Sequence, residues 1–291
     1  MLGGITSSVH RLSVRTVRGT TQVVLKRFCD PHVPSPDRAI AEPDQESTRL
    51  AEVWADAEAI VVNEAAALAA VEAMAVPAPR LLGVSPDGAD TDGAPSLLMT
   101  RASGRVWLTP DDVDAWIRQL ATLLPVLHAG SADVWTHERR DPDALVVPGS
   151  AQRPEVWTAA RNLITAEPPK SELVLTHGDY QHFNVLWSRG RLSALVDWSS
   201  SRIAPADLDV GHCRLNLAVL FSPEVAEDFR RAYESKAGRR VEPWWDVHQL
   251  LAYNDSWPTF VPVQVAGRAP VDVRGMTGRV EELLGMALER L

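Results

Sequence analysis

The sequence predicts an α+β protein with two lobes: a small antiparallel β N-lobe that carries one long helix, and a larger, mainly helical C-lobe. Three observations lead to this fold class. The first hundred residues alternate strand-like runs with one Ala- and Glu-rich segment, a strongly amphipathic helical segment follows, and the chain beyond residue 205 is mostly helical in pattern. We expect residues 1–101 to form the N-terminal lobe and residues 102–291 the C-terminal lobe, with a hinge near residues 101–105.

The N-terminal part has the pattern of a small sheet. Four strands are predicted, at residues 9–17, 21–28, 80–84 and 96–101. Residues 29–46 are rich in Pro and Asp, which indicates a loop. A helix is predicted from about residue 46 to Met74, because Ala and Glu recur at helical spacing and Pro77 then ends the pattern.

The C-terminal part mixes helices with short strands. Helices are predicted at residues 111–129 and 155–166, and strands at residues 173–176, 185–187 and 192–197. The first of these helices has one apolar face, formed by Val113, Trp116, Ile117, Leu120, Leu124 and Leu127. From Pro205 to Leu291 the chain is predicted to be mainly helical.

Composition restricts the compartment and the partners. In 291 residues, no apolar run reaches the roughly 18 residues of a membrane span, and the N-terminus lacks the basic and apolar regions of a secretory signal. Two distant cysteines, Cys29 and Cys213, make neither a disulfide framework nor a zinc site. We therefore expect a cytoplasmic protein. The net charge of −9 argues against a nucleic-acid or membrane partner and is compatible with a cationic small molecule.

The stretch from residue 173 to 198 carries the chemistry. A strand leads into a polar loop with His177, Asp179 and Asn184, and two further strands end at Asp197. The aspartate and asparagine oxygens thereby gather at neighbouring strand ends. Magnesium prefers such hard oxygen ligands, and phosphoryl transfer uses a carboxylate near the attacking hydroxyl.

His177-Gly178-Asp179, with Asn184 five residues after the aspartate, and Val196-Asp197-Trp198 resemble the catalytic segment of the aminoglycoside phosphotransferase and choline kinase-like family. The resemblance implies a protein-kinase-like fold and an ATP-dependent phosphotransferase that moves the γ-phosphate to a hydroxyl of a small molecule. It also implies that Asp179 is the catalytic base and that Asn184 and Asp197 bind Mg²⁺.

The resemblance extends to the nucleotide site. The phosphate-covering loop would comprise Gly3, Gly4, Ser7 and Ser8. Lys26 matches the lysine that holds the phosphates, and Glu64 matches the helix glutamate that pairs with it. Met99 and Arg101 match the hinge that meets the adenine. Relatives usually carry further elements before the glycine-rich loop, which the N-terminal lobe is expected to lack.

Two other residues in the motifs have an expected structural role. Asp209 is expected to brace the catalytic loop, and His128 to pack at a helix end. His182 is assigned no role.

Two rival functions remain open. A metal hydrolase could use His177, Asp179, His182 and Asp197, but that reading leaves the lysine, the helix glutamate and the glycine loop unexplained. A catalytically inactive relative or a protein kinase is the second rival. The short connection from Asp197 to Pro205 leaves no platform for a peptide and favours a small substrate.

The acceptor is the least constrained part of the prediction, since one scaffold can serve many substrates. Of the ten tryptophans, Trp244, Trp245 and Trp257 lie where the family builds its acceptor pocket. Acidic residues nearby are Glu234, Glu242, Asp246 and Asp255. Aromatic rings and carboxylates attract cations, so we expect an aminoglycoside-like or other amino-bearing acceptor. Neutral sugars, macrolides and amino alcohols are the alternatives, and no protein partner is implied.

Overall fold

The computed structural model describes residues 7–17, 19–28 and 56–291. The strands are β1 (Ser8–Thr16), β2 (Gly19–Arg27), β3 (Leu81–Ser85), β4 (Ser96–Thr100), β5 (Trp135–Thr136), β6 (Leu173–Thr176), β7 (Val185–Ser188), β8 (Arg191–Leu195) and β9 (Arg202–Pro205). The helices are α2 (Ala57–Glu72), α3 (Val113–Leu127), α4 (Pro154–Thr165), α5 (Asp207–Leu220), α6 (Pro223–Ala237), α7 (Pro243–Leu250), α8 (Trp257–Val265) and α9 (Met276–Leu288), with 3-10 turns η1 (Pro142–Ala144) and η2 (His182–Asn184). None of the described helices is long and apolar enough to cross a bilayer.

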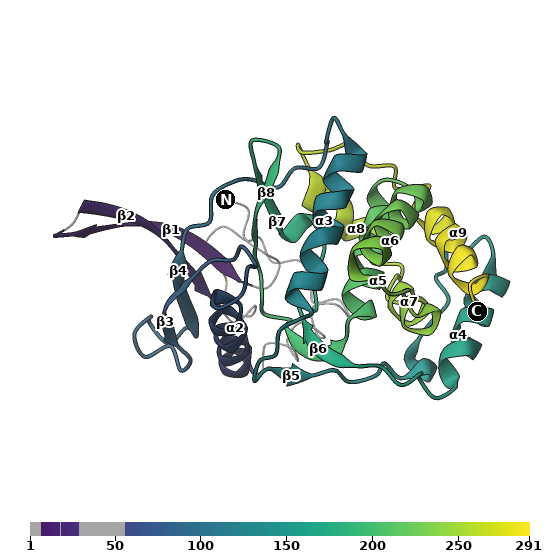
Figure 1. Cartoon of the computed structure of the whole chain (residues 1–291), viewed down its shortest axis with the longest axis horizontal. Coiled ribbons are helices and arrows are strands. Elements are labelled where there is room, and N and C mark those ends of the chain that lie inside the picture. Colours follow the sequence, from purple (N-terminus) through teal and green to yellow (C-terminus); the bar gives the residue numbers. More distant parts are fainter. Residues whose placement is uncertain (1–6, 18, 29–55) are drawn as a thin grey trace.

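The N-terminal sheet has the strand order β1-β2-β4-β3, and every neighbouring pair is antiparallel. Helix α2 lies beside this sheet at one end of the molecule, and helices α4 to α9 lie toward the other end (Figure 1). This arrangement confirms the predicted α+β class. The division of the chain at residues 101 and 102 stays a prediction.

Helix α2 is shorter in the described residues than the predicted helix. It begins after Asp56, whose side chain accepts a hydrogen bond from the backbone nitrogen of Ala59 at 3.0 Å and so caps the first turn. Residues 46–55, which the prediction included, and the predicted loop at 29–46 lie outside the described residues, as do Gly3 and Gly4.

Two small sheets carry the polar loop between β6 and β7. Strands β5, β9 and β6 form one sheet, and β7 and β8 form a hairpin that turns at Arg189 and Gly190, both with positive φ. The predicted strand at 192–197 ends at Leu195 instead. The reason is Asp197, whose φ of 68° is incompatible with an extended strand.

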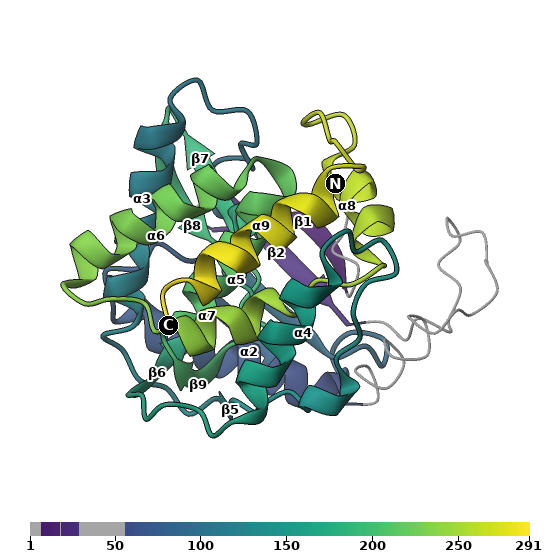
Figure 2. The ribbon, with the colours of Figure 1, turned by 90° about the vertical axis from the view of Figure 1, so that its right-hand side faces the viewer.

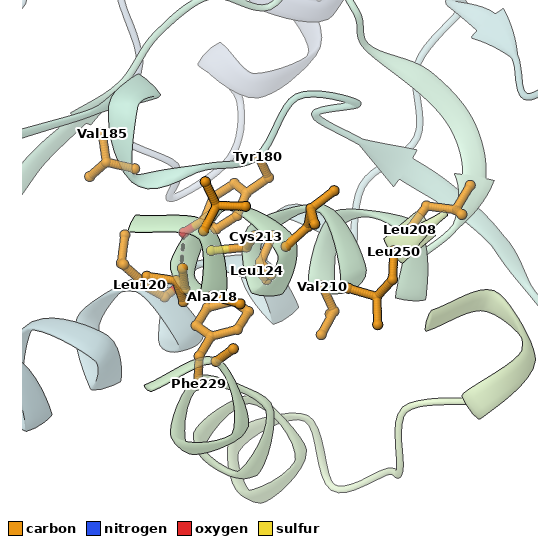
Figure 3. Close-up of a cluster of buried hydrophobic side chains, with 14 of the residues drawn as sticks. Leu120, Leu124, Tyr180, Val185, Leu208, Val210, Cys213, Ala218, Phe229 and Leu250 are labelled. Carbon is orange, nitrogen blue, oxygen red and sulfur yellow. Dashed lines mark hydrogen bonds between the residues drawn. The ribbon is translucent and has the colours of Figure 1, made fainter. Parts of the chain in front are cut away.

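The helical region is built around α5, which is buried along nearly its whole length. It contacts α6, α7 and α9, and α9 crosses the outer side of these helices (Figure 2). Figure 3 shows the apolar cluster beneath the polar loop, where the hydroxyl of Tyr180 donates to the carbonyl oxygen of Leu120 at 2.8 Å. The loop therefore packs on a buried apolar core.

A buried ion network lies behind this core. Arg214 of α5 is fully buried and pairs with Glu227 of α6 and Asp246 of α7, and Arg290 reaches the same Asp246. Such pairs are costly to break because the remaining charge is left in an apolar environment. The network joins three helices to the C-terminal end of the described chain.

Candidate active site

The polar loop begins at Gly178, where only glycine fits. Its φ is 78°, and a Cβ atom there would lie 1.9 Å from the carbonyl oxygen of Ser200. The backbone nitrogens of His177 and Gly178 donate to Asp209 at 2.8 and 2.9 Å, so the carboxylate of Asp209 fixes the start of the loop.

Asp209 also accepts a hydrogen bond from Nε2 of His128 at 3.2 Å. Burial acts to raise the pKa of Asp209, but the hydrogen bond and charge of His128 outweigh it, so the pKa lies below its ordinary value. The expectation for Asp209 agrees with these contacts. The interpretation of His128 as a packing residue was incomplete, because its imidazole is a polar partner of that brace.

Asp179 sits at the end of the braced loop with its side chain about one-third exposed (32%). Its Oδ1 atom accepts hydrogen bonds from Nε2 of Gln181 at 2.7 Å and Nε2 of His212 at 2.8 Å. Its Oδ2 atom accepts one from Nδ2 of Asn184 at 2.7 Å. Three side chains thus hold the carboxylate in place, while it remains partly open to solvent.

Asn184 is oriented by two bonds from the same nitrogen. Its Nδ2 atom donates to the backbone oxygen of Asp179 at 2.9 Å as well as to Oδ2. Its own backbone oxygen accepts from Val196, which ties the loop to the chain just before Asp197. The amide oxygen Oδ1 accepts no hydrogen bond among the described residues and is available as a ligand.

Lys26 joins the N-terminal sheet to this site. Its ammonium lies 2.7 Å from Oε2 of Glu64 on α2 and 2.7 Å from Oδ1 of Asp197. Burial acts to lower the pKa of Lys26, but the two carboxylates raise it above its ordinary value, so the ammonium stays charged. The sequence prediction that Lys26 and Glu64 come together agrees with this geometry.

Glu64 and its neighbour Asn63 anchor α2 to the segment after β8. The second oxygen of Glu64 accepts from the backbone nitrogen of Trp198 at 3.3 Å. The side chain of Asn63 donates to the carbonyl of Ser201 at 2.9 Å and accepts from the nitrogen of Trp135 at 2.9 Å. Sequence reasoning missed Asn63, because these bonds form only across distant segments.

Asp197 presents one free oxygen. Both Lys26 and the hydroxyl of Ser199, at 3.0 Å, donate to its Oδ1 atom, whereas Oδ2 accepts no hydrogen bond among the described residues. Burial acts to raise the pKa of Asp197, but the charge of Lys26 outweighs it, so the pKa lies below its ordinary value. An ionised carboxylate oxygen and the amide oxygen of Asn184 are a donor set that fits Mg²⁺.

The other predicted nucleotide residues occupy the sheet. Ser7 directly precedes β1, Ser8 begins it, and Val9 pairs with Lys26 across the two strands. Met99 is buried in β4, so its side chain belongs to the core, and Arg101 follows the end of that strand in an exposed position.

The predicted acceptor surface is wrong in its main members. Trp244, Trp245 and Trp257 are buried in the helical core, with 4%, 6% and 7% exposure. Asp246 is fully buried and is committed to two arginines. Amphipathic helices placed these side chains inward, a property that the composition of the segment could not show.

The remaining acids of that prediction have local partners. Glu234 pairs with Arg230 at 2.7 Å, and Asp255 accepts from the backbone nitrogen of Gly149 at 2.8 Å. Glu242 caps α7. These contacts account for the carboxylates without a ligand.

The hydrolase arrangement does not form in the described part of the chain. No group of three or more His, Cys, Asp or Glu side chains gathers there as a metal site. His182 is fully buried beside the rings of Trp116 and Phe221, and burial lowers its pKa to about 3. Its side chain packs among these rings.

One protein family matches most of the chain. Residues 12–245 match the family described as "Phosphotransferase enzyme family". No curated protein sequence matches the chain.

Solved structures share the fold at low identity. A thermostable mutant of aminoglycoside phosphotransferase APH(4)-Ia, in a ternary complex with AMP-PNP and hygromycin B, is 16% identical, with a TM-score of 0.60 over 98% of this chain and 92% of that one. The amicoumacin kinase hAmiN, in complex with AMP-PNP, Ca²⁺ and Ami, is 12% identical, with a TM-score of 0.54 over 97% and 86%. A choline/ethanolamine kinase family protein from Mesorhizobium loti is 17% identical, with a TM-score of 0.50 over 98% and 90%.

Proposed function

Because the chain belongs to the phosphotransferase enzyme family, we propose that it transfers the γ-phosphate of ATP to a hydroxyl group of a small molecule, with Mg²⁺, in the cytoplasm. The observation that carries this proposal is the meeting of Lys26, Glu64 and Asp197 at 2.7 Å beside a loop that holds Asp179 and Asn184. Phosphoryl transfer uses a lysine that contacts the phosphates, side chains that bind the metal, and a carboxylate near the acceptor hydroxyl, and these residues can supply each of them.

Asp179 is the catalytic base of the proposed reaction. Its carboxylate accepts the proton of the acceptor hydroxyl while the hydroxyl oxygen bonds to the γ-phosphorus and ADP leaves with the electrons of the broken bond. The exposure of its side chain lets an acceptor approach, and the hydrogen bonds from Gln181, Asn184 and His212 prevent it from turning away.

The oxygens that would hold Mg²⁺ are Oδ2 of Asp197 and Oδ1 of Asn184. When bound, the metal neutralises charge on the phosphates. Lys26 would contact the phosphates, and Glu64 keeps the ammonium directed toward them. Ser7, Ser8 and the backbone near Met99 and Arg101 stay predicted contacts of the nucleotide, as do Gly3 and Gly4.

For the acceptor we propose a hydroxylated small molecule, and amino-bearing compounds of the aminoglycoside type are the first class to test. The support is the net charge of −9 and the likeness in fold to enzymes crystallised with hygromycin B or Ami. The buried tryptophans no longer support it. Neutral sugars, macrolides and amino alcohols remain the alternative acceptors.

The experiment that tests the proposal is an acceptor screen with purified protein. ADP release is followed with ATP, with and without Mg²⁺, across aminoglycosides, macrolides, choline, amino sugars and neutral sugars. We expect ADP release that requires both Mg²⁺ and one acceptor class. Release with neutral acceptors only would contradict the amino-bearing class, and binding of neither ATP nor its analogues would contradict the kinase function.

A further inference from the structure

A chain of hydrogen bonds runs from Arg140 to the proposed base. Nη2 of Arg140 donates to Oε1 of Gln249 at 3.2 Å, and Nε2 of Gln249 lies 2.9 Å from Nδ1 of His212. Nε2 of His212 lies 2.8 Å from Oδ1 of Asp179. The four residues come from the segment before η1, from α7, from α5 and from the polar loop, so the chain forms only in the folded protein.

The donors and acceptors along this chain favour one arrangement of protons. Nδ2 of Asn216 also lies 3.3 Å from Nε2 of His212, but it makes a shorter bond, of 3.0 Å, to the backbone oxygen of His212. Arg140 can only donate, so the oxygen of the Gln249 amide faces it and the NH₂ group faces His212. Nδ1 of His212 must then accept and carries no proton. The proton of the neutral imidazole is therefore on Nε2, where it is donated to the carboxylate of Asp179.

The number of hydrogen bonds that each oxygen accepts distinguishes the two oxygens of Asp179. A carboxylate oxygen has about two lone-pair positions for hydrogen bonds. On Oδ1, both are occupied, by Gln181 and His212, whereas Oδ2 has only Asn184. The open position on a partly exposed carboxylate therefore belongs to Oδ2.

We propose that His212, held in its Nε2–H form by Gln249 and Arg140, is a positioning residue for Asp179, and that it directs Oδ2 to receive the proton of the acceptor hydroxyl. This inference rests on the proposed function of Asp179. It adds a residue of α5 that does not touch the nucleotide site in the described structure and that acts through the base.

The variants His212→Leu and His212→Gln test whether His212 supports catalysis by Asp179. The leucine removes the donor, and kcat should fall about 10- to 100-fold, as expected for the loss of one hydrogen bond to a charged group. The glutamine can offer an NH₂ group near the position of Nε2 and should restore most of kcat. The KM for ATP should stay the same in both. Equal kcat for wild type and His212→Leu would overturn the proposal.

Val219→Ala is the matched control. Val219 lies two turns further along α5 and is buried in the hydrophobic core, and its side chain has no polar group to offer His212 or Asp179. We expect kcat of this variant to stay within about two-fold of wild type. An equal loss of kcat in Val219→Ala and His212→Leu would mean that general disturbance of α5 explains the effect, which would overturn the positioning role.

Imidazole nitrogen NMR tests the proton arrangement without an activity assay. In protein labelled with ¹⁵N-histidine, the His212 signals, assigned with His212→Gln, should show a protonated Nε2 and an unprotonated Nδ1 near neutral pH. Gln249→Glu presents only carboxylate oxygens to Nδ1 and should place a proton there. A proton on Nδ1 in the wild type would overturn the inference.

A failure of the proposed function can be told apart from a failure of the role of His212. If the wild type transfers no phosphate to any acceptor while the NMR signals match, the proposed function fails and the hydrogen-bond chain is structural. If phosphate transfer occurs and Asp179→Asn abolishes it but His212→Leu does not reduce it, only the role of His212 fails.

Discussion

The ammonium of Lys26 lies 2.7 Å from Oδ1 of Asp197, although the two residues are 171 positions apart in the sequence. This ion pair connects β2 of the N-terminal sheet to the segment that follows β8. It leaves Oδ2 of Asp197 without a donor in the described residues, so one carboxylate can contact the lysine and a metal at the same time. Lys26, Glu64 and Asp197, the proposed nucleotide and metal residues, thus form one electrostatic unit.

Lys26→Met should weaken ATP binding and lower turnover, because the phosphates lose their positive partner and two carboxylates lose theirs. Glu64→Gln should have a smaller effect, since Asp197 still holds the lysine. Calorimetry with Mg–ATP measures both. Lys236→Met, at an exposed position on α6, is the control. Unchanged affinity in Lys26→Met would refute the assignment of this lysine.

Asp197→Ala should remove the Mg²⁺-dependent part of nucleotide affinity and abolish turnover. Asn184→Ala should lower both less completely, because Asp197 remains to bind the metal, although the variant also releases Oδ2 of Asp179. Nucleotide titrations with and without Mg²⁺ give the difference directly. The metal assignment is wrong if Mg²⁺ still strengthens ATP binding to Asp197→Ala as much as it does in the wild type.

Asp209→Asn should destabilise the protein by about 1–3 kcal/mol, because an amide cannot accept from two backbone nitrogens and from His128 as a carboxylate does. Urea unfolding at neutral pH measures the free energy. Asp179→Asn, whose side chain is partly exposed, serves as the comparison and should lose little stability. Equal stability of Asp209→Asn and the wild type would contradict the bracing role.

Buried His182 should make the protein sensitive to mild acid. Burial lowers its folded-state pKa from 6.5 to about 3, so below pH 6.5 the unfolded chain binds a proton that the folded one does not. The free energy of unfolding should therefore decrease as pH falls from about 6.5, by up to about 1.4 kcal/mol per pH unit for this group.

His182→Leu should reduce that pH dependence, because leucine fits the apolar surroundings of Trp116 and Phe221 and does not titrate. His10→Leu, at an exposed position of β1, should leave the slope unchanged. Urea unfolding at pH 7, 6 and 5 gives the slopes. Identical slopes for His182→Leu and wild type would show that His182 does not stay neutral in the folded protein.

Periodicity and turn residues predicted most of the fold. The amphipathic pattern gave α3 within two residues at each end, and the strands at 185–187 and 192–197 were placed correctly except for the end of the second. Strands β5 and β9 were missed, because β5 has only two residues and the sequence of β9, Arg-Ile-Ala-Pro, has no alternating pattern. The inward direction of Trp244 and Trp245 was missed because it depends on which helices surround α7.

The residues of the candidate site could also be predicted only in part. Asp179, Asn184 and Asp197 stand in one continuous motif, so their spacing indicated them. Gln181 and His212 could not be found, since nothing near either residue in the sequence shows that both meet Oδ1 of Asp179. Such contacts depend on the register between the polar loop and α5, which only the folded chain defines.

Phosphate transfer by wild type and Asp179→Asn tests the central claim most directly. Each protein is incubated with Mg–ATP and an acceptor identified in the screen, and the phosphorylated product is measured by mass spectrometry beside a calorimetric titration of Mg–ATP. We predict that Asp179→Asn lowers kcat about 10²- to 10⁴-fold with similar affinity for Mg–ATP. Near-normal turnover of Asp179→Asn, with the product formed as in the wild type, would contradict the account.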